Sequence, residues 1–215
     1  MTNHPSVLFE LSEAISFIHS RGWCPGTGGN FSVVSSLSPL RLSITPSSVD
    51  KESVLPEQFI EVDETGRLLS GSGKPSAETL LHVAIIESRR AGCVLHTHSP
   101  WNTALSLACP EDRRSLKIYG LEMLKGLSGV ATHQHSETVP ILGNSQDMTA
   151  LSSEVLSVLS EQPECHGFLL RGHGLYTWGA DVFEARRHVE IFEFLFETVG
   201  RLKSIGAADG FFTYS

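Results

Sequence analysis

The chain has 215 residues, of which 40% are hydrophobic and 19% are charged, a composition typical of folded globular proteins rather than disordered ones. Its formal net charge of -8, with no basic cluster, argues against binding nucleic acid, because phosphate neutralisation needs grouped lysine and arginine. No apolar run approaches the roughly 20 residues that cross a bilayer, and the amino terminus lacks a secretory-signal pattern. The scattered cysteines include no Cys-x-x-Cys pair, which favours free thiols in a cytoplasmic protein.

The apolar pattern predicts helices and strands interspersed along a single domain, 1–215, without repeats or linkers. The helix expected at 77–90 has Ser76 as its N-cap, whereas the pattern of 116–127 does not decide its class. Because regular βαβ spacing is missing, a mixed, largely antiparallel sheet with helices on its faces is favoured. The other elements, in chain order, are a helix at 6–20, strands at 31–35, 41–45 and 58–63, a strand at 93–95, a helix at 102–108, a strand at 138–142, a helix at 146–160, a strand at 167–171 and a helix at 180–204.

Two histidines follow the buried strand expected at 93–95. Residues two apart on a strand point to the same face, so His96 and His98 supply half of a divalent metal site. A lone His-x-His is more often a core histidine beside a hydrogen-bonded one, so a third ligand has to be found. His173 has the most similar context, because it follows the apolar strand 167–171 and lies between two glycines.

The remaining ligand candidates are His82, His133, His135 and His166. His82 lies within the second expected helix, where packing against the sheet is the favoured interpretation. His133 and His135 form a second His-x-His in a polar segment that no apolar strand precedes. We expect that pair in an exposed loop, with an ancillary metal or substrate contact as the less favoured alternative.

Two glutamates are candidates for proton transfer. Glu78 lies in the first turn of its expected helix, where the helix dipole alone explains a carboxylate. Glu122 lies between Leu121 and Met123, and apolar neighbours raise the pKa of a carboxyl toward the range of a proton shuttle. The alternative for Glu122, a solvated residue on an amphipathic segment, is equally compatible with the sequence.

Three small, polar segments are candidates for binding a phosphate group. They hold Gly29 and Asn30 in a glycine-rich loop, Ser47 and Ser48 in a turn, and Ser76 before a helix. Exposed backbone N–H groups in such segments bind anions, and a helix amino terminus adds a favourable dipole. The chain has neither a Walker A motif nor Gly-x-Gly-x-x-Gly after a strand, which argues against a nucleotide.

Four segments together resemble the class II (zinc-dependent) aldolase and adducin-like family. They are Gly-Thr-Gly-Gly-Asn-Phe-Ser at 26–32, Lys-Pro-Ser-Ala-Glu at 74–78, His-Thr-His-Ser at 96–99 and Arg-Gly-His-Gly at 171–174. They occur in the family's order and cover nearly the whole chain. The resemblance implies a three-layer α/β/α sandwich around a mixed, largely antiparallel sheet. It also implies a homotetramer with active sites between subunits.

The resemblance further implies one Zn2+ ion per subunit, held by His96, His98 and His173. It assigns acid/base catalysis to Glu122 and places Glu78 near the metal. The partner that it implies is a small phosphorylated ketose. The family's phosphate pocket matches Gly29, Asn30, Ser47, Ser48 and Ser76.

Within the family, the segments 96–99, 122–126 and 171–179 are most similar to its sugar-phosphate dehydratases. Aldol cleavage or epimerisation of a phosphorylated ketose is the first alternative, and a non-catalytic, adducin-like binding module is the second. The chain departs from many aldolases at Ala77, where one hydroxyl donor is missing. Tyr214 is not assumed to be the catalytic tyrosine that a longer aldolase tail carries.

Overall fold

The computed structural model describes residues 4–207 and 210–215, and in this part of the chain ten strands form one sheet. The strand order is β10-β6-β7-β8-β9-β5-β1-β2-β3-β4, and of these neighbours only β7 and β8 are parallel. The expected mixed, largely antiparallel sheet is therefore confirmed. The strands are β1 (Asn30–Leu37), β2 (Leu40–Ile44), β3 (Ile60–Asp63), β4 (Leu68–Ser70), β5 (Cys93–Thr97), β6 (Ser115–Tyr119), β7 (Ser136–Leu142), β8 (Gly167–Leu170), β9 (Gly174–Gly179) and β10 (Phe212–Tyr214).

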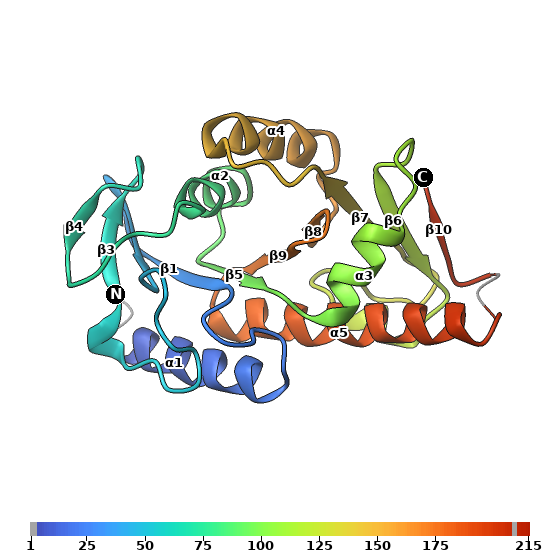
Figure 1. Ribbon diagram of the computed structural model, residues 1–215, viewed down its shortest axis with the longest axis horizontal. Helices are drawn as coiled ribbons and strands as arrows, with labels where there is room; N and C mark the ends of the chain where they lie inside the picture. Colours follow the sequence, from blue (N-terminus) through green and yellow to red (C-terminus); the bar gives the residue numbers. More distant parts are fainter. Residues whose placement is uncertain (1–3, 208–209) are drawn as a thin grey trace.

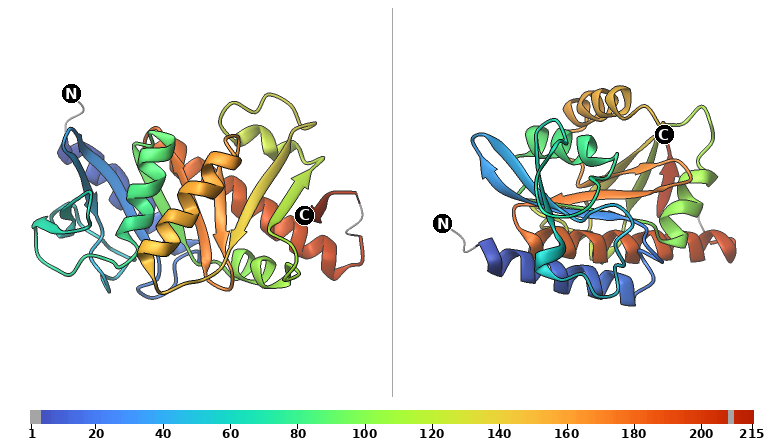
Figure 2. Two further views of the ribbon diagram at one scale, coloured as in Figure 1. Left: turned by 90° about the horizontal axis from the view of Figure 1, so that it is seen from above. Right: turned by 60° about the vertical axis from the view of Figure 1, so that its left-hand side comes forward.

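Helices cover both faces of the sheet, which confirms the three-layer sandwich. Figures 1 and 2 show α2 and α4 side by side on one face, with α1 and α5 on the other. Among the described residues, no helix has the length and hydropathy needed to span a membrane. The helices are α1 (His4–Ser20), α2 (Thr79–Arg89), α3 (Pro100–Ala108), α4 (Met148–Glu161) and α5 (Val182–Ser204), with short 3-10 turns η1 (Pro56–Gln58) and η2 (Glu122–Gly126).

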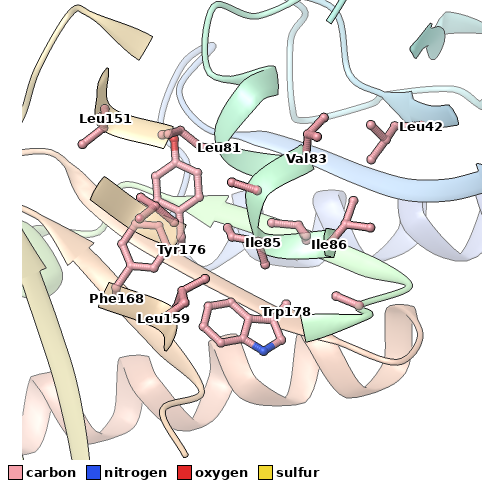
Figure 3. Packing of buried hydrophobic residues seen from close by; sticks show 14 of the residues in the cluster. Leu42, Leu81, Val83, Ile85, Ile86, Leu151, Leu159, Phe168, Tyr176 and Trp178 are labelled. Atoms are coloured by element: carbon pink, nitrogen blue, oxygen red, sulfur yellow. The ribbon is translucent and has the colours of Figure 1, made fainter. Parts of the chain in front are cut away.

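The layer between α2, α4 and the sheet is an apolar cluster with aromatic rings at its centre. Phe168 and Tyr176, on adjacent strands, stack with ring centroids 5.0 Å apart (Figure 3). Leu81 and Ile85 of α2 are fully buried against the same cluster. Full burial of such a side chain stabilises the fold by roughly 1.5–3 kcal/mol, so this layer holds the middle of the sheet rigid.

Strand pairing brings distant segments to one end of the sheet. His96 on β5 is paired with Asn30 on β1 and with Tyr176 on β9, and both pairings are antiparallel. The end of β5 therefore lies beside the start of β1 and the start of β9. His173 occupies the tight turn between β8 and β9, next to the same point.

The structure differs from the expectations at several elements. The undecided segment 116–127 contains strand β6 and the turn η2, and strands β4, β9 and β10 were not expected. The second helix begins at Thr79, and its N-cap is Glu78 rather than Ser76. The Ser76 hydroxyl instead accepts a hydrogen bond from the backbone N–H of Glu78 at 3.2 Å, which forms a turn before the helix.

Candidate metal centre

Three imidazoles converge where β5, β1 and β9 meet. The Nε2 atom of His96 lies 2.7 Å from Nε2 of His98 and 3.3 Å from Nε2 of His173. Among the described residues, these three form the one group of histidine, cysteine or carboxylate side chains whose ligand atoms all lie within 4.8 Å of one another. This donor set suits a divalent metal ion, because three protein nitrogens leave a position open for substrate.

The protonation states of His96 and His98 favour metal binding. Nδ1 of His96 lies 2.9 Å from the carbonyl oxygen of Leu175, so Nδ1 donates and Nε2 keeps its lone pair for a ligand bond. Burial, and then the neighbouring His98 and His173, lower the pKa of His96 well below its usual range. Burial, followed by the charges of His173 and Lys51, lowers the pKa of His98 to about 4. Neutral imidazole is the form that binds a metal.

Two glycines allow the backbone to approach the cluster closely. Gly29 has a φ of +77°, and a Cβ there would lie 2.5 Å from the His96 carbonyl oxygen. A Cβ at Gly174 would lie 2.9 Å from Cδ2 of His98 and 3.0 Å from Cε1 of His96. Any side chain at either position would collide with the cluster or its strand, so the glycines are part of the site.

Glu78 faces the cluster and is held by a chain of buried polar groups. Its Oε1 lies 3.3 Å from Nε2 of His173, and its Oε2 lies 3.8 Å from Nε2 of His96. The amide nitrogen of Asn30 donates to Glu78, and the amide oxygen of Asn30 faces Nε2 of His82. His82 is buried, which lowers its pKa to about 3, and its Nδ1 faces the Ser32 hydroxyl at 2.7 Å. Proton donation therefore runs from serine to histidine to asparagine to carboxylate, which fixes the orientation of each group.

His82 is buried in the core as expected, but its role in orienting Asn30 was not foreseen. Tyr176 was also missed. Its ring stacks on His96 with centroids 3.9 Å apart and planes at 12°, which restricts the His96 ring. Burial, and then the nearby charge of Glu78, raise the pKa of Tyr176 well above its ordinary value. The sequence did offer one signal for Tyr176. It lies three residues after His173, and one tight turn returns the chain to the same site.

The segments expected to bind phosphate line one cavity beside the histidines. Its volume is about 220 Å³. Ser48 has a φ of +65°, an uncommon conformation for a residue other than glycine, and the amide nitrogen of Asn30 lies 3.3 Å from the Ser76 hydroxyl. The structure therefore brings the five proposed phosphate residues together with Glu78 and the metal cluster. The lining residues are Thr27, Gly28, Gly29, Asn30, Pro46, Ser47, Ser48, Ser76, Glu78, His98 and His173.

Glu122 lies apart from this cavity within the single chain. It begins η2, its side chain is 68% exposed, and its Oε1 accepts from Nζ of Lys125 at 2.5 Å. The expectation of a raised pKa is wrong for this chain. The hydrogen bond and charge of Lys125, with a smaller contribution from His133, lower the pKa of Glu122. Its apolar sequence neighbours do not enclose the carboxylate.

The second His-x-His is divided between two environments. His133 is exposed, as expected, and its Nδ1 lies 3.6 Å from Oε2 of Glu122. His135 is not part of an exposed loop, because it is half-buried and its Nε2 contacts Oε2 of buried Glu137 at 2.9 Å. His166 contacts the same oxygen at 3.0 Å. Neither His135 nor His166 belongs to the metal cluster.

Solved structures share this architecture. An L-fuculose 1-phosphate aldolase aligns with 95% of this chain and 91% of its own, at a TM-score of 0.76 and 20% sequence identity. The L-fuculose-1-phosphate aldolase from Thermus thermophilus aligns with 94% of this chain and 98% of its own, at a TM-score of 0.71 and 23% identity. At these identities the likeness establishes the fold.

Sequence relatives are closer than these structures. A methylthioribulose-1-phosphate dehydratase from Pseudomonas savastanoi pv. phaseolicola is 42% identical over 197 residues, 91% of this chain and 95% of that protein. The enzyme of the same name from Pectobacterium atrosepticum is 44% identical over 191 residues, 88% of this chain and 91% of that protein. Residues 9–199 also match the family described as Class II Aldolase and Adducin N-terminal domain. The chain therefore belongs to the class II aldolase and adducin family.

Proposed function

We propose that this chain is a Zn2+-dependent hydro-lyase that dehydrates 5-methylthioribulose 1-phosphate to 2,3-diketo-5-methylthiopentyl 1-phosphate, a step of methionine salvage. One observation carries the proposal: the Glu78 carboxylate, the phosphate-binding segments and two imidazoles of the three-histidine cluster, those of His98 and His173, line a single cavity of about 220 Å³. The choice of dehydration within the family is supported by relatives of that name at 42–44% identity over most of the chain.

The chain's residues have distinct roles in this proposal. A Zn2+ ion at His96, His98 and His173 supplies Lewis acidity, which polarises the substrate ketone and makes the neighbouring C3–H more acidic. The N–H and O–H groups of the cavity bind the phosphate and hold the ketone end at the histidines. Glu78, held by its Asn30 contact, orients the reacting groups beside the histidines. The phosphate-binding residues are Gly29, Asn30, Ser47, Ser48 and Ser76.

Glu122 is the proposed acid/base, and it acts across a subunit boundary. Its carboxylate takes the C3 proton and, as a carboxylic acid, protonates the C4 hydroxyl, which leaves as water. The resulting enol becomes the diketone. Because Glu122 is exposed and apart from the cavity of its own chain, it reaches a site only in the homotetramer that the family resemblance implies. Burial against another subunit removes water from the carboxylate and raises its pKa toward the range of a proton shuttle.

Product analysis tests the reaction. Incubation of the zinc-loaded protein with 5-methylthioribulose 1-phosphate is expected to yield one diketone. Two carbonyl fragments would instead indicate aldol cleavage. Absence of stoichiometric metal in the purified protein, together with no turnover, would favour a non-catalytic binding module.

Subunit mixing tests the assignment of Glu122. Glu122→Gln and His173→Ala subunits are each expected to be inactive alone. Mixed tetramers are expected to regain activity, because an intact metal cluster then meets an intact Glu122 from a neighbour. If Glu122→Gln alone keeps full activity while Glu78→Gln abolishes it, Glu78 is the base. If both single variants are inactive and mixing restores nothing, Glu122 does not act between subunits.

We also propose that residues 1–215 form a single domain in a cytoplasmic protein. The ten-stranded sheet, which continues from β10 to β4, supports the single domain. The four cysteines are buried free thiols, which suits a reducing compartment.

A further inference from the structure

A buried lysine connects the two loops that form the phosphate cavity. The Lys51 side chain is 1% exposed, and its Nζ donates to the carbonyl oxygens of Thr27 at 3.1 Å and Val49 at 2.9 Å. Thr27 precedes Gly28 and Gly29 in the glycine-rich loop, whereas Val49 follows Ser47 and Ser48. One ammonium group therefore fixes both walls of the cavity from behind.

This ammonium has no anionic partner of its own. In the described ranges, 4–207 and 210–215, no carboxylate forms an ion pair with Lys51, and its charged or thiol neighbours are Cys24 and Asp50. Burial raises the pKa of Cys24 to about 12, so that neighbour is a neutral thiol. Asp50 is exposed, and its Oδ1 accepts from the N–H of Glu52. Burial without a carboxylate partner disfavours the ammonium form and lowers the pKa of Lys51, so a lysine at this position calls for a reason other than packing.

The cavity in front of Lys51 lacks a positive side chain. Its lining contains neither lysine nor arginine, and its one carboxylate, Glu78, repels an anion. Lys51 lies directly behind the cavity wall, because its Nζ donates to the carbonyl oxygen of Thr27, a residue that lines the cavity. This buried ammonium is therefore one source of positive potential for a phosphate group in the cavity.

We propose that Lys51 is a positioning residue that holds the two phosphate loops in register and supplies the counter-charge for the substrate phosphate. This inference rests on the proposed function, because it assumes that the cavity binds phosphate. Lys51 donates its hydrogen bonds to loop carbonyls, so it does not contact the phosphate itself. It acts through the electrostatic potential of its charge and through the loop N–H groups that it orients.

Three substitutions separate the charge from the hydrogen bonds. Lys51→Met removes both, Lys51→Gln keeps an N–H donor without the charge, and Lys51→Arg keeps both. Lys117→Met removes the charge of an exposed lysine on β6 and serves as the matched control. Each variant is assayed for KM and kcat with 5-methylthioribulose 1-phosphate and with the phosphate-free ketose, for competitive inhibition by inorganic phosphate, and for zinc content.

Lys51→Met and Lys51→Gln are expected to raise KM for the phosphorylated substrate and Ki for inorganic phosphate by about 10- to 100-fold. The kcat, the zinc content and the weak turnover of the phosphate-free ketose are expected to stay near wild type, and Lys51→Arg to retain most of the affinity. The inference would be overturned if Lys51→Gln bound phosphate with wild-type affinity, or if the loss of affinity were equal for both substrates. Lys51 would then serve only as a contact between the loops. If Lys51→Met does not fold, Lys51→Gln against Lys51→Arg decides. A wild-type enzyme that does not bind inorganic phosphate and does not distinguish the two substrates would overturn the phosphate cavity itself.

Discussion

The metal cluster (His96, His98 and His173) and a second histidine cluster (His135, His166 and His188) lie in one chain and have opposite chemistry. In the metal cluster, ring nitrogens face one another at 2.7 and 3.3 Å. In the second cluster, the ring nitrogens instead face a carboxylate of opposite charge or a backbone group that completes a hydrogen bond. A grouping of histidines therefore indicates a metal site only where the lone pairs converge on one point.

The second cluster fixes the peptide of Ser128, two residues after η2. Nε2 of His166 donates to the Ser128 carbonyl oxygen at 2.7 Å, while Nε2 of His188 accepts from the Ser128 N–H at 3.0 Å. Nδ1 of His188 donates to the Trp178 carbonyl oxygen, so His188 is neutral. His166 faces an acceptor at both nitrogens, because its Nδ1 contacts Glu137, so His166 carries both protons. The ion pair between His166 and Glu137 is therefore structural, and this cluster anchors the segment that carries Glu122.

Removal of one metal ligand is expected to have the largest effect. His173→Ala leaves two imidazoles, which do not complete the three-ligand set of a catalytic metal site. We expect loss of stoichiometric zinc, measured by elemental analysis of the dialysed protein, and loss of dehydration. His135→Ala is the matched control and is expected to retain the metal. Retention of one zinc per chain by His173→Ala would contradict the assignment of the metal cluster.

Removal of the carboxylate in the second cluster is expected to destabilise the fold without releasing metal. Glu137 is 1% exposed, and Glu137→Gln leaves His166 without its counter-charge. The expected loss is about 3 kcal/mol or more in the free energy of unfolding, measured in urea. Addition of His166→Gln is expected to recover part of that loss, because no buried charge then remains. A loss of zinc in Glu137→Gln would mean that the two clusters are coupled.

The sequence was sufficient to predict that His96, His98 and His173 come together, because the signals for these histidines are local. His96 and His98 end an apolar run, and His173 lies between glycines after another, so strand pairing alone brings them together. The glycine and serine segments were also recognisable, because their composition alone predicts exposed groups that can bind a phosphate. The family resemblance then supplied the order and the architecture.

The sequence was insufficient for features that depend on distant partners. The Glu137 carboxylate is paired by His166, 29 residues away, and nothing near Glu137 distinguishes it from a solvated glutamate. Lys51 lies in a polar segment, where burial is not expected. The apolar neighbours of Glu122 pointed to an enclosed carboxyl, whereas the exposed turn η2 leaves it paired with Lys125. For Glu137 and Lys51 the deciding surroundings belong to the tertiary structure, whereas Lys125 is only three residues from Glu122, and it is the exposure of η2 that the local pattern did not reveal.

In the metal-free protein, the pH dependence of stability is expected to have one sign for His98 of the metal cluster and His188 of the second cluster, and the opposite sign for His166 of the second cluster. His98 and His188 have pKa values lowered to about 4, chiefly by burial, so stability falls as pH drops below the unfolded value of about 6.5. For His166, burial opposes the proton, but the hydrogen bond and charge of Glu137 outweigh it and raise the pKa. Its contribution is complete below pH of about 6.5 and is lost as pH rises through the folded pKa.

Urea unfolding of metal-free protein at a series of pH values measures both the acid decline and the alkaline decline in stability. His166→Gln is expected to remove the alkaline decline, at most about 1.4 kcal/mol per pH unit for one proton, and to leave the acid decline unchanged. A His166→Gln protein with the wild-type alkaline slope would show that His166 is not the group that titrates there.

His133→Ala is expected to have the smallest effect. The His133 and Glu122 side chains are 58% and 68% exposed, so water screens their contact at 3.6 Å and it contributes little to stability. The free energy of unfolding of the single chain is expected to change by less than about 0.5 kcal/mol, and the zinc content not at all. Its neighbour His135 supplies the contrast, since loss of the His135 contact leaves a buried oxygen of Glu137 with one donor fewer. A larger loss that appears only in the assembled protein would mean that assembly buries His133 together with Glu122, which is the environment that catalysis across a subunit boundary requires.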